Sequence, residues 1–175
     1  MNRLLLKGKI FLLMLIALGV ATSCKDDDDD EPMLTLQSFM QQAAASDLFE
    51  ITTGQMAAQK GTMPETRAFG EMLVRDHTMS SSELMTLASQ KTVTLSMTLP
   101  QDKAQKVTTL NNATGTAFDR QFAQMQVQAH QEAIDLYEKA DQDITDAQVQ
   151  AFIDKTLPVL RMHLDHAEDL EDMTD

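Results

Sequence analysis

The chain has 175 residues with one cysteine, no tryptophan and 13 methionines, and its 14 basic and 27 acidic residues give a formal charge of −13. This charge disfavours binding to nucleic acid or to anionic lipid head groups, because both repel an acidic surface. The sequence contains no glycine-rich phosphate loop, no Gly-x-Ser-x-Gly motif and no basic aromatic patch, so it indicates no catalytic residue.

The first residues resemble the signal peptide of a bacterial lipoprotein. Basic residues come first, and an apolar run of 12 residues follows from Ile10 to Ala21. That run covers only about 18 Å as a helix, which is too short to span a bilayer but suits a signal peptide. Small residues then precede Cys24, in the order of a lipobox. We therefore expect removal of residues 1–23 and attachment of lipid chains such as palmitate to Cys24, which would anchor the protein in a membrane.

An acidic run follows Cys24. Lys25 is succeeded by six acids, Asp26 to Glu31, which repel one another and bury no apolar area, so residues 24–33 are predicted to form an extended tether. The order Lys25-Asp26-Asp27-Asp28 is also similar to the signal that exports lipoproteins of Bacteroidetes-type bacteria to the outer face of the outer membrane. Two interpretations stay open: a surface-exposed outer-membrane lipoprotein, or a plain tether that faces the periplasm. A calcium site is a third, but the run lacks the interleaved glycine of an EF-hand loop.

The part that remains after residues 1–23 is removed is more acidic than the whole chain. Three basic and no acidic residues are lost, which leaves 11 basic against 27 acidic residues and a formal charge of −16 over 152 residues. This length is sufficient for one domain with its own core. We expect the membrane as a partner through the lipid anchor and no nucleic acid, while the sequence names no protein partner.

Residues 34–175 are predicted to form an all-α domain, because they are rich in Ala, Gln, Met, Leu and Glu and poor in Gly and Pro. The patterns predict four long helices and a short one, at residues 34–60, 62–90, 101–110, 116–141 and 145–171. Thr62, Thr116 and Thr145 each begin a pattern typical of a capping box, with Pro64 in the first turn of the second helix. Pro158 is predicted to kink the last helix.

The lengths of the links predict the topology. The links between the first and second and between the third and fourth long helices are only a few residues long, which forces antiparallel hairpins. Between the hairpins, residues 91–115 are extended as far as Pro100 and then form the short helix. A long crossover between two hairpins is the connectivity of a ferritin-like four-helix bundle, and an up-down-up-down bundle with an ornamented loop is the alternative.

Each long helix carries an inward stripe whose residues alternate in spacings of three and four. Each stripe contains one titratable residue near the middle of its helix, and these residues are Glu50, His77, His130 and His163. His166 lies one turn along the same face as His163. Because mid-helix residues of a four-helix bundle lie at similar depth, we expect the four side chains to converge into one cluster.

Four segments carry a resemblance to a known family: residues 39–51, 69–77, 114–122 and 157–167. Over about residues 35–172 the chain resembles the ferritin-like family of bacterial envelope proteins that is catalogued as domain of unknown function 4142. The resemblance implies a ferritin-like bundle with Glu50, His77, His130 and His163 as characteristic polar positions, and it implies no established activity. The chain departs from the family at Ala129, where an aspartate usually precedes the histidine.

The spacing around the histidines bears on metal chemistry. A carboxylate-bridged di-iron site needs Glu-x-x-His on two helices, but the residues three positions before the histidines are Val74, Val127 and Leu160. Ferritin-type oxidation is therefore disfavoured. One glutamate and three histidines could instead hold a single Zn, Cu or Fe ion. Thioethers at Met72, Met125 and Met162, close to these histidines in sequence, would favour Cu(I).

Two other interpretations of the cluster stay open. Buried histidines often form hydrogen bonds with a neighbouring acid, so a pair between Glu50 and a histidine would make a structural polar core. Proton-transfer catalysis is the third. Most methionines are interpreted as packing residues. We therefore interpret the chain as a lipid-anchored envelope or interaction module without catalysis, and a mononuclear metal-binding protein is the alternative.

Overall fold

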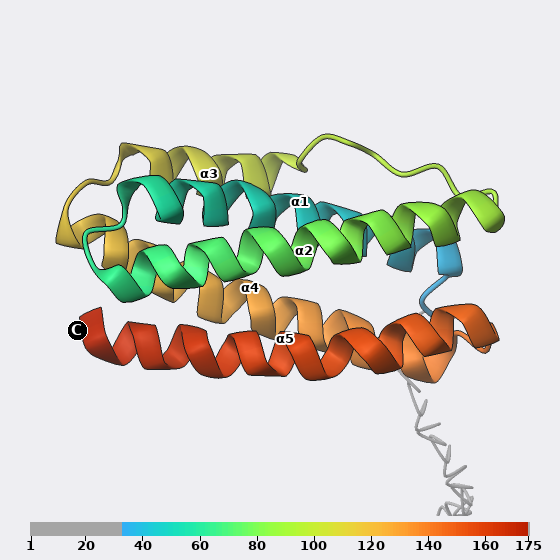
Figure 1. Cartoon of the computed structure of the whole chain (residues 1–175). Helices are drawn as coiled ribbons and strands as arrows, with labels where there is room; N and C mark the ends of the chain where they lie inside the picture. Colours follow the sequence, from blue (N-terminus) through green and yellow to red (C-terminus); the bar gives the residue numbers. More distant parts are fainter. Residues whose placement is uncertain (1–32, 175) are drawn as a thin grey trace, which may run out of the picture. The chain divides into compact units, whose positions relative to one another are not determined.

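The computed structural model describes residues 33–174, so the expected signal peptide, the lipidation of Cys24 and most of the acidic tether lie outside the described residues. The described part contains five α-helices and no strand, which confirms the all-α prediction (Figure 1). None of these helices is long and apolar enough to cross a membrane. The helices are α1 (Leu36–Lys60), α2 (Pro64–Gln90), α3 (Gln101–Asn112), α4 (Thr116–Asp143) and α5 (Ala147–Thr174).

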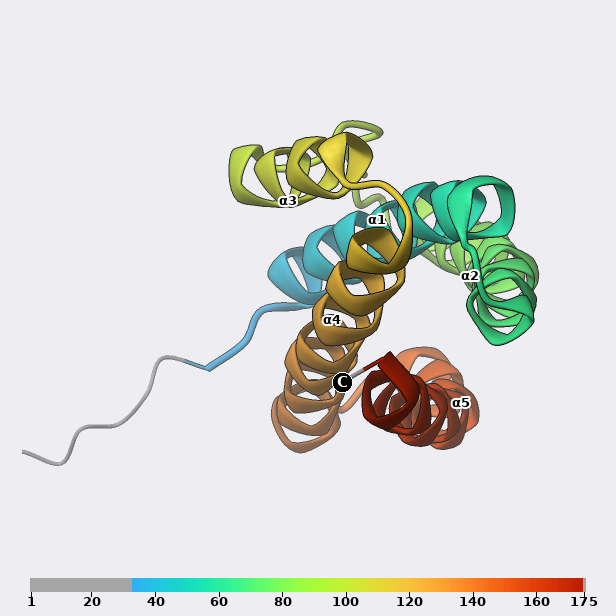
Figure 2. The ribbon, with the colours of Figure 1, turned by 90° about the vertical axis from the view of Figure 1, so that its left-hand side faces the viewer.

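The order of the helices is that of a ferritin-like bundle. Helices α1 and α2 form one antiparallel hairpin and α4 and α5 form the other, while α1 packs beside α4 and α2 beside α5 (Figures 1 and 2). The crossover at residues 91–115 returns along the length of the bundle, and its helix α3 packs against α1 and α4. Helices α2 and α4 therefore run in the same direction, which excludes the up-down-up-down alternative.

The predicted capping box at Thr62 is wrong. Met63 is the N-cap of α2 and makes no side-chain cap hydrogen bond, although Pro64 does occupy the first turn. The Thr62 N–H instead donates to Asp119 Oδ1 of α4 at 2.9 Å, and the Thr62 hydroxyl also donates to that carboxylate. Through these hydrogen bonds the buried Asp119 holds the α1–α2 turn against α4, and it does not cap its own helix. Gly115, with φ of 63°, precedes α4 in place of the predicted box.

The predicted start of the last helix is displaced as well. Asp146, not Thr145, caps α5, because its Oδ1 atom accepts hydrogen bonds from the N–H groups of Gln148 and Val149 at 3.1 and 3.3 Å. The helix continues without interruption through Pro158 to Thr174. The short helix predicted after Pro100 is confirmed as α3.

A polar layer divides the core of the bundle into two apolar clusters. The first, here called the Phe39 cluster, consists of Phe39, Met40, Ala43, Leu84, Leu87, Ala88, Ala133, Ile134, Tyr137, Ala140, Ile144, Val149, Phe152, Ile153, Leu157 and Leu160. The second, the Phe122 cluster, consists of Ala57, Phe69, Leu73, Leu110, Ala113, Phe118, Phe122, Ala123, Ala167 and Leu170. Between them lies the polar layer, formed by the buried residues Ser46, Asp47, Glu50, Thr53, His77, Gln126, His130 and His163. All four long helices contribute to each level.

Two glycines bring α1 and α2 close together beside the polar layer. A Cβ atom on Gly54 would lie 2.8 Å from the carbonyl oxygen of Gly70, and one on Gly70 would lie 2.6 Å from the carbonyl oxygen of Gly54. No side chain fits in either position without moving backbone. This close approach fixes α1 against α2 one turn beyond Glu50, so the α1 and α2 parts of the polar layer face each other at a defined height.

Candidate metal centre

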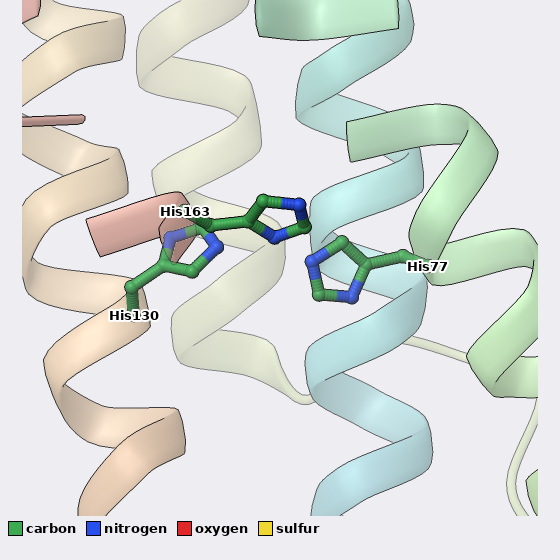
Figure 3. Close-up of side chains that lie close together, drawn as sticks. All are labelled: His77, His130 and His163. Carbon is green, nitrogen blue, oxygen red and sulfur yellow. The ribbon is translucent and has the colours of Figure 1, made fainter. Parts of the chain in front are cut away.

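Three of the four predicted residues meet at the centre of the polar layer. His77 of α2, His130 of α4 and His163 of α5 are at most 4% exposed, and one ligand nitrogen of each lies within 4.8 Å of the other two (Figure 3). The ring centroid of His163 lies 5.3 Å from that of His77 and 5.3 Å from that of His130. The structure thus contains the convergence of histidines that the inward stripes predict.

A backbone carbonyl defines the tautomer of His130. Its Nδ1 atom lies 2.9 Å from the carbonyl oxygen of Gln126, one turn earlier in α4. A carbonyl oxygen only accepts hydrogen bonds, so Nδ1 carries the hydrogen and the Nε2 lone pair points into the space between the three rings (Figure 3). The Gln126 side chain is held in turn, because its Nε2 donates to Thr53 Oγ1 at 3.0 Å.

Carboxylates orient the other two rings. Asp47 of α1 lies with Oδ1 2.8 Å from His77 Nδ1, and Asp76 of α2 lies with Oδ2 3.0 Å from His163 Nε2. In each pair the ring nitrogen donates to the carboxylate, so the other nitrogen of the ring is the one available to a metal ion once it carries no proton. Each histidine is therefore anchored on one side and directs its second nitrogen toward the other two rings.

The three inward nitrogens have no hydrogen-bond partner in the described part of the chain. They are His77 Nε2, His130 Nε2 and His163 Nδ1, and all three are buried. Buried polar atoms of folded proteins are nearly always paired, because an unpaired one costs about 1–3 kcal/mol. Three such atoms that face the same space therefore indicate a place for a ligand that accepts three nitrogen lone pairs.

Glu50, the fourth predicted residue, is buried nearby but does not join this group. Its side chain is 1% exposed, and neither carboxylate oxygen has a hydrogen-bond partner among residues 33–174. Burial raises the pKa of Glu50 to about 7, although the charges of His77 and Lys103 oppose the rise. The Glu50–histidine hydrogen bond expected of a purely structural polar core is absent, because Asp47 takes that place beside His77.

Burial keeps two of the rings neutral. Burial, together with the charge of the neighbouring His77, lowers the pKa of His130 to about 3 and that of His163 to about 4. Burial also acts to lower the pKa of His77, but the hydrogen bond to Asp47 and the charge of Glu50 outweigh it, so the pKa is raised. The cluster thus presents two neutral imidazoles, and His77 keeps its proton to a higher pH than an ordinary histidine does.

Comparison with known proteins places the chain in a family. The family model described as Domain of unknown function (DUF4142) matches residues 22–170. The chain belongs to this family. Among the curated proteins searched, none matches this DUF4142 chain.

Solved structures share the fold of this DUF4142 protein. The Cu(II)-bound form of CopM has a TM-score of 0.67 at 20% identity, over 78% of this chain and 95% of that one. The Cu(I)-bound form of CopM has a TM-score of 0.65, also at 20% identity, over 78% and 94%. A conserved hypothetical protein, rv2844 from Mycobacterium tuberculosis, has a TM-score of 0.59 at 12% identity, over 77% and 89%. At these identities the likeness establishes the fold alone.

Several residues of the centre were missed by the sequence reasoning. The anchors Asp47 and Asp76 were not assigned to it, although Asp47 lies three residues before Glu50 and Asp76 immediately precedes His77. The adjacency of Asp76 is misleading, because its carboxylate bonds to His163 on another helix rather than to His77. Helical spacing alone does not identify such partners, because each carboxylate lies on a different helix from the ring that it anchors.

The thioethers predicted beside the histidines do not surround the three rings. Met162 is 40% exposed, and Met72 and Met125 are partly buried against the Phe122 cluster. His166, predicted on the inward face of α5, is exposed instead. The donors at the centre are therefore imidazole nitrogens, with the Glu50 carboxylate as the nearby acid.

Proposed function

We propose that this DUF4142 protein binds a single copper ion through His77, His130 and His163. The observation that carries the proposal is the set of three buried, unpartnered nitrogens that face one space. One metal ion would satisfy all three. The hydrogen bonds on the far side of each ring also favour this function, because metal-ligating histidines are almost always held by a carboxylate or a carbonyl on their other nitrogen.

Charge and coordination favour Cu(I) among the Zn, Cu and Fe ions that the sequence allows. Three neutral imidazoles suit a three-coordinate monovalent ion, whereas Zn²⁺ would need a fourth ligand, for which Glu50 is the candidate. A monovalent ion would also bring into the buried layer no more charge than the proton that it displaces from His77. The solved CopM structures with the same fold are described as Cu(I)-, Cu(II)- and Ag-bound forms.

Metal content tests the proposal directly. Protein purified without an affinity tag, and without any step that supplies metal, is analysed by mass spectrometry for copper, zinc and iron and then titrated with Cu(I) against a chromogenic chelator. His77→Ala and His163→Ala are expected to abolish tight binding. Gln131→Ala is the matched control, because this exposed residue follows His130 on the same helix.

The alternatives predict other results of the same measurements. If Glu50 is a ligand, Glu50→Gln lowers affinity for Zn²⁺ far more than for Cu(I). If the layer is only structural, no variant changes metal content, since the unaltered protein then holds none. This last result would overturn the proposed function.

We propose further that the copper-binding bundle is anchored in the cell envelope through lipidated Cys24, with Lys25-Asp26-Asp27-Asp28 directing it to the outer face of the outer membrane. The support is the signal-peptide pattern and the acidic run. Cys24→Ser is expected to release the protein from membranes, which fractionation measures. Replacement of Asp26–Asp30 by Ala is expected to leave lipidation intact but to reduce cleavage by protease added to whole cells. Equal cleavage of both proteins would contradict the export role.

A further inference from the structure

Two cavities between α2 and α5, together called the groove here, are both lined with methionine. The first has a volume of about 230 Å³ and is lined by Phe69, Met72, His166 and Met173, with acids beside them. The second has a volume of about 260 Å³ and is lined by Asp76, Met79, Met162 and neighbouring residues. These cavities open where the two hairpins meet, along the helix that carries His163.

The methionines of the groove stand out from the rest of the surface. Within residues 33–174, the large hydrophobic side chains that are exposed are all methionines, and three of them line the groove: Met79 at 61%, Met162 at 40% and Met173 at 57%. Leucine, isoleucine and phenylalanine would be equally suitable for apolar packing. The thioether is what distinguishes these residues chemically, because it is a soft metal ligand.

One aromatic ring separates the first cavity from the histidine centre. The centroid of Phe69 lies 6.0 Å from that of exposed His166, and 6.2 and 6.3 Å from those of buried His163 and His130. Phe69 is itself only 5% exposed. An ion held beside His166 would therefore lie one side chain away from the buried rings.

The two cavities differ in the donors that they offer. The first combines an imidazole with two thioethers, and the carboxylates of Glu65 and Asp169 also line it, so it attracts cations. The second has thioethers but no imidazole, and it opens onto Asp76, whose carboxylate is bonded to Arg75 and His163. Only the first cavity therefore offers a complete set of nitrogen and sulfur donors.

We infer that His166, Met72 and Met173 form a second, solvent-open site for Cu(I), from which the ion passes Phe69 to the buried histidines. This inference rests on the proposed function. Two thioethers and one imidazole select a soft monovalent ion over Zn²⁺ or Fe²⁺. The transfer changes no oxidation state: the three buried imidazole nitrogens replace the donors of the first cavity around the same ion, and the proton of His77 passes to water as the ion binds.

The experiment uses the full chain with Cys24→Ser in every sample, so that no thiol competes for the metal. Ag(I) serves as a redox-inert probe of the number of ions bound, and Cu(I) is added anaerobically to follow the rate at which the buried centre fills. The test variant combines Met72→Leu, Met173→Leu and His166→Gln. The matched control is Met79→Leu with Met162→Leu, which removes the same number of thioethers from the second cavity. Leucine keeps the apolar bulk, and circular dichroism checks folding.

The unaltered chain is expected to bind a second soft ion, and the test variant to lose it and to fill the buried centre more slowly. The control is expected to match the unaltered chain. Phe69→Leu should speed filling without changing the number of ions. An unchanged ion count and filling rate in the test variant would overturn the inference and leave the proposed function standing. The His163→Ala variant is expected to lose the buried ion and to keep the ion in the groove, which would show that the two sites are separate. If the unaltered chain never fills the histidine centre, the proposed function itself is refuted.

Discussion

The Phe39 cluster and the polar layer are two adjoining parts of one core, built by the same four long helices and equally shielded from water. In the Phe39 cluster, the rings of Phe39 and Tyr137 pack edge to face with centroids 5.1 Å apart. In the polar layer, three imidazole nitrogens and both oxygens of Glu50 have no hydrogen-bond partner in the part of the chain that the structure describes. Apolar packing stabilises the free protein wherever it occurs, whereas unpartnered polar atoms reduce its stability. The arrangement of the polar layer is therefore favourable when an ion is bound and unfavourable in the metal-free protein.

The polar layer also differs between its outer and inner sides. On the outer side, Asp47, Asp76 and the carbonyl of Gln126 each accept a hydrogen bond from one ring. On the inner side the remaining ring nitrogens have no partner among the described residues. If the layer served stability alone, we would expect both nitrogens of each ring to have hydrogen-bond partners, rather than one of the two. We therefore expect substitutions in the Phe39 cluster to change mainly the stability of the protein, and substitutions in the polar layer to change mainly its metal binding.

The largest effect on stability is expected from the Phe39 cluster. Phe39→Ala removes a fully buried ring and leaves a cavity, so the free energy of unfolding should fall by about 3–5 kcal/mol. Urea denaturation measures this change. Met97→Ala, at a side chain that is 66% exposed, serves as the control and should change stability by less than about 0.5 kcal/mol. A folded Phe39→Ala protein should still bind copper at the histidines; loss of copper would show that the two regions are not separable.

A smaller effect is expected from the anchor of His163. Asp76→Ala removes the carboxylate that orients the ring, so Cu(I) affinity should fall about 10- to 100-fold, or ~1.4–2.7 kcal/mol. Competition with a chelator measures the affinity. Asp165→Ala, at an exposed position two residues after His163, is the control and should leave affinity unchanged. Equal affinities in both variants would show that the ring needs no anchor.

The stability of the metal-free protein should depend on pH because of the polar layer. His130 and His163, with pKa values of about 3 and 4, stay neutral in the folded protein near pH 5.5 but gain protons on unfolding, where the ordinary value is 6.5. Glu50, with a pKa of about 7, is protonated when folded and loses that proton on unfolding, where the ordinary value is 4.5. His77, whose pKa is raised, is protonated in both states.

Unfolding near pH 5.5 therefore takes up about one proton net, and the free energy of unfolding should fall by about 1.4 kcal/mol for each pH unit of acidification. The decrease begins as the pH falls through about 6.5, the ordinary value for histidine, and it should level off below about 4, where His163 and His130 of the folded protein gain protons themselves. Urea denaturation of metal-free protein at a series of pH values measures the slope. A stability that is flat between pH 6.5 and 4.5 would contradict the assigned protonation states.

The smallest change in stability is expected from the substitution that should abolish metal binding. His130→Leu replaces the ring with an apolar side chain of similar volume and removes the unpartnered Nε2 atom, while the Gln126 carbonyl keeps its bond within α4. The free energy of unfolding of the metal-free protein should change by less than about 1 kcal/mol. Calorimetry and metal titration together check this pair of outcomes. A large loss of stability would instead assign His130 a structural role.

Much of the architecture could be predicted from local pattern. Alternating spacings of three and four residues predict the inward stripes, and Glu50, His77, His130 and His163 are indeed buried. The short links and the long crossover likewise predict the ferritin-like connectivity that Figures 1 and 2 show. The predicted N-caps failed, because Thr62 and Asp119 satisfy one another across 57 residues of sequence instead of capping their own helices. A capping motif predicts a local bond only where no partner from another helix competes for the same atoms.

Except at His166, the sequence by itself determined which of the titratable stripe residues face inward and at what height, because helical periodicity and element length are local properties. The tertiary structure alone decided which nitrogen of each ring faces the others and why Glu50 stands apart. Those outcomes depend on bonds between distant segments: Asp47 with His77 across 30 residues, and Asp76 with His163 across 87. Each such bond exists only once the two helices that carry its partners have packed side by side, because the direction of a ring nitrogen depends on the partner on the neighbouring helix.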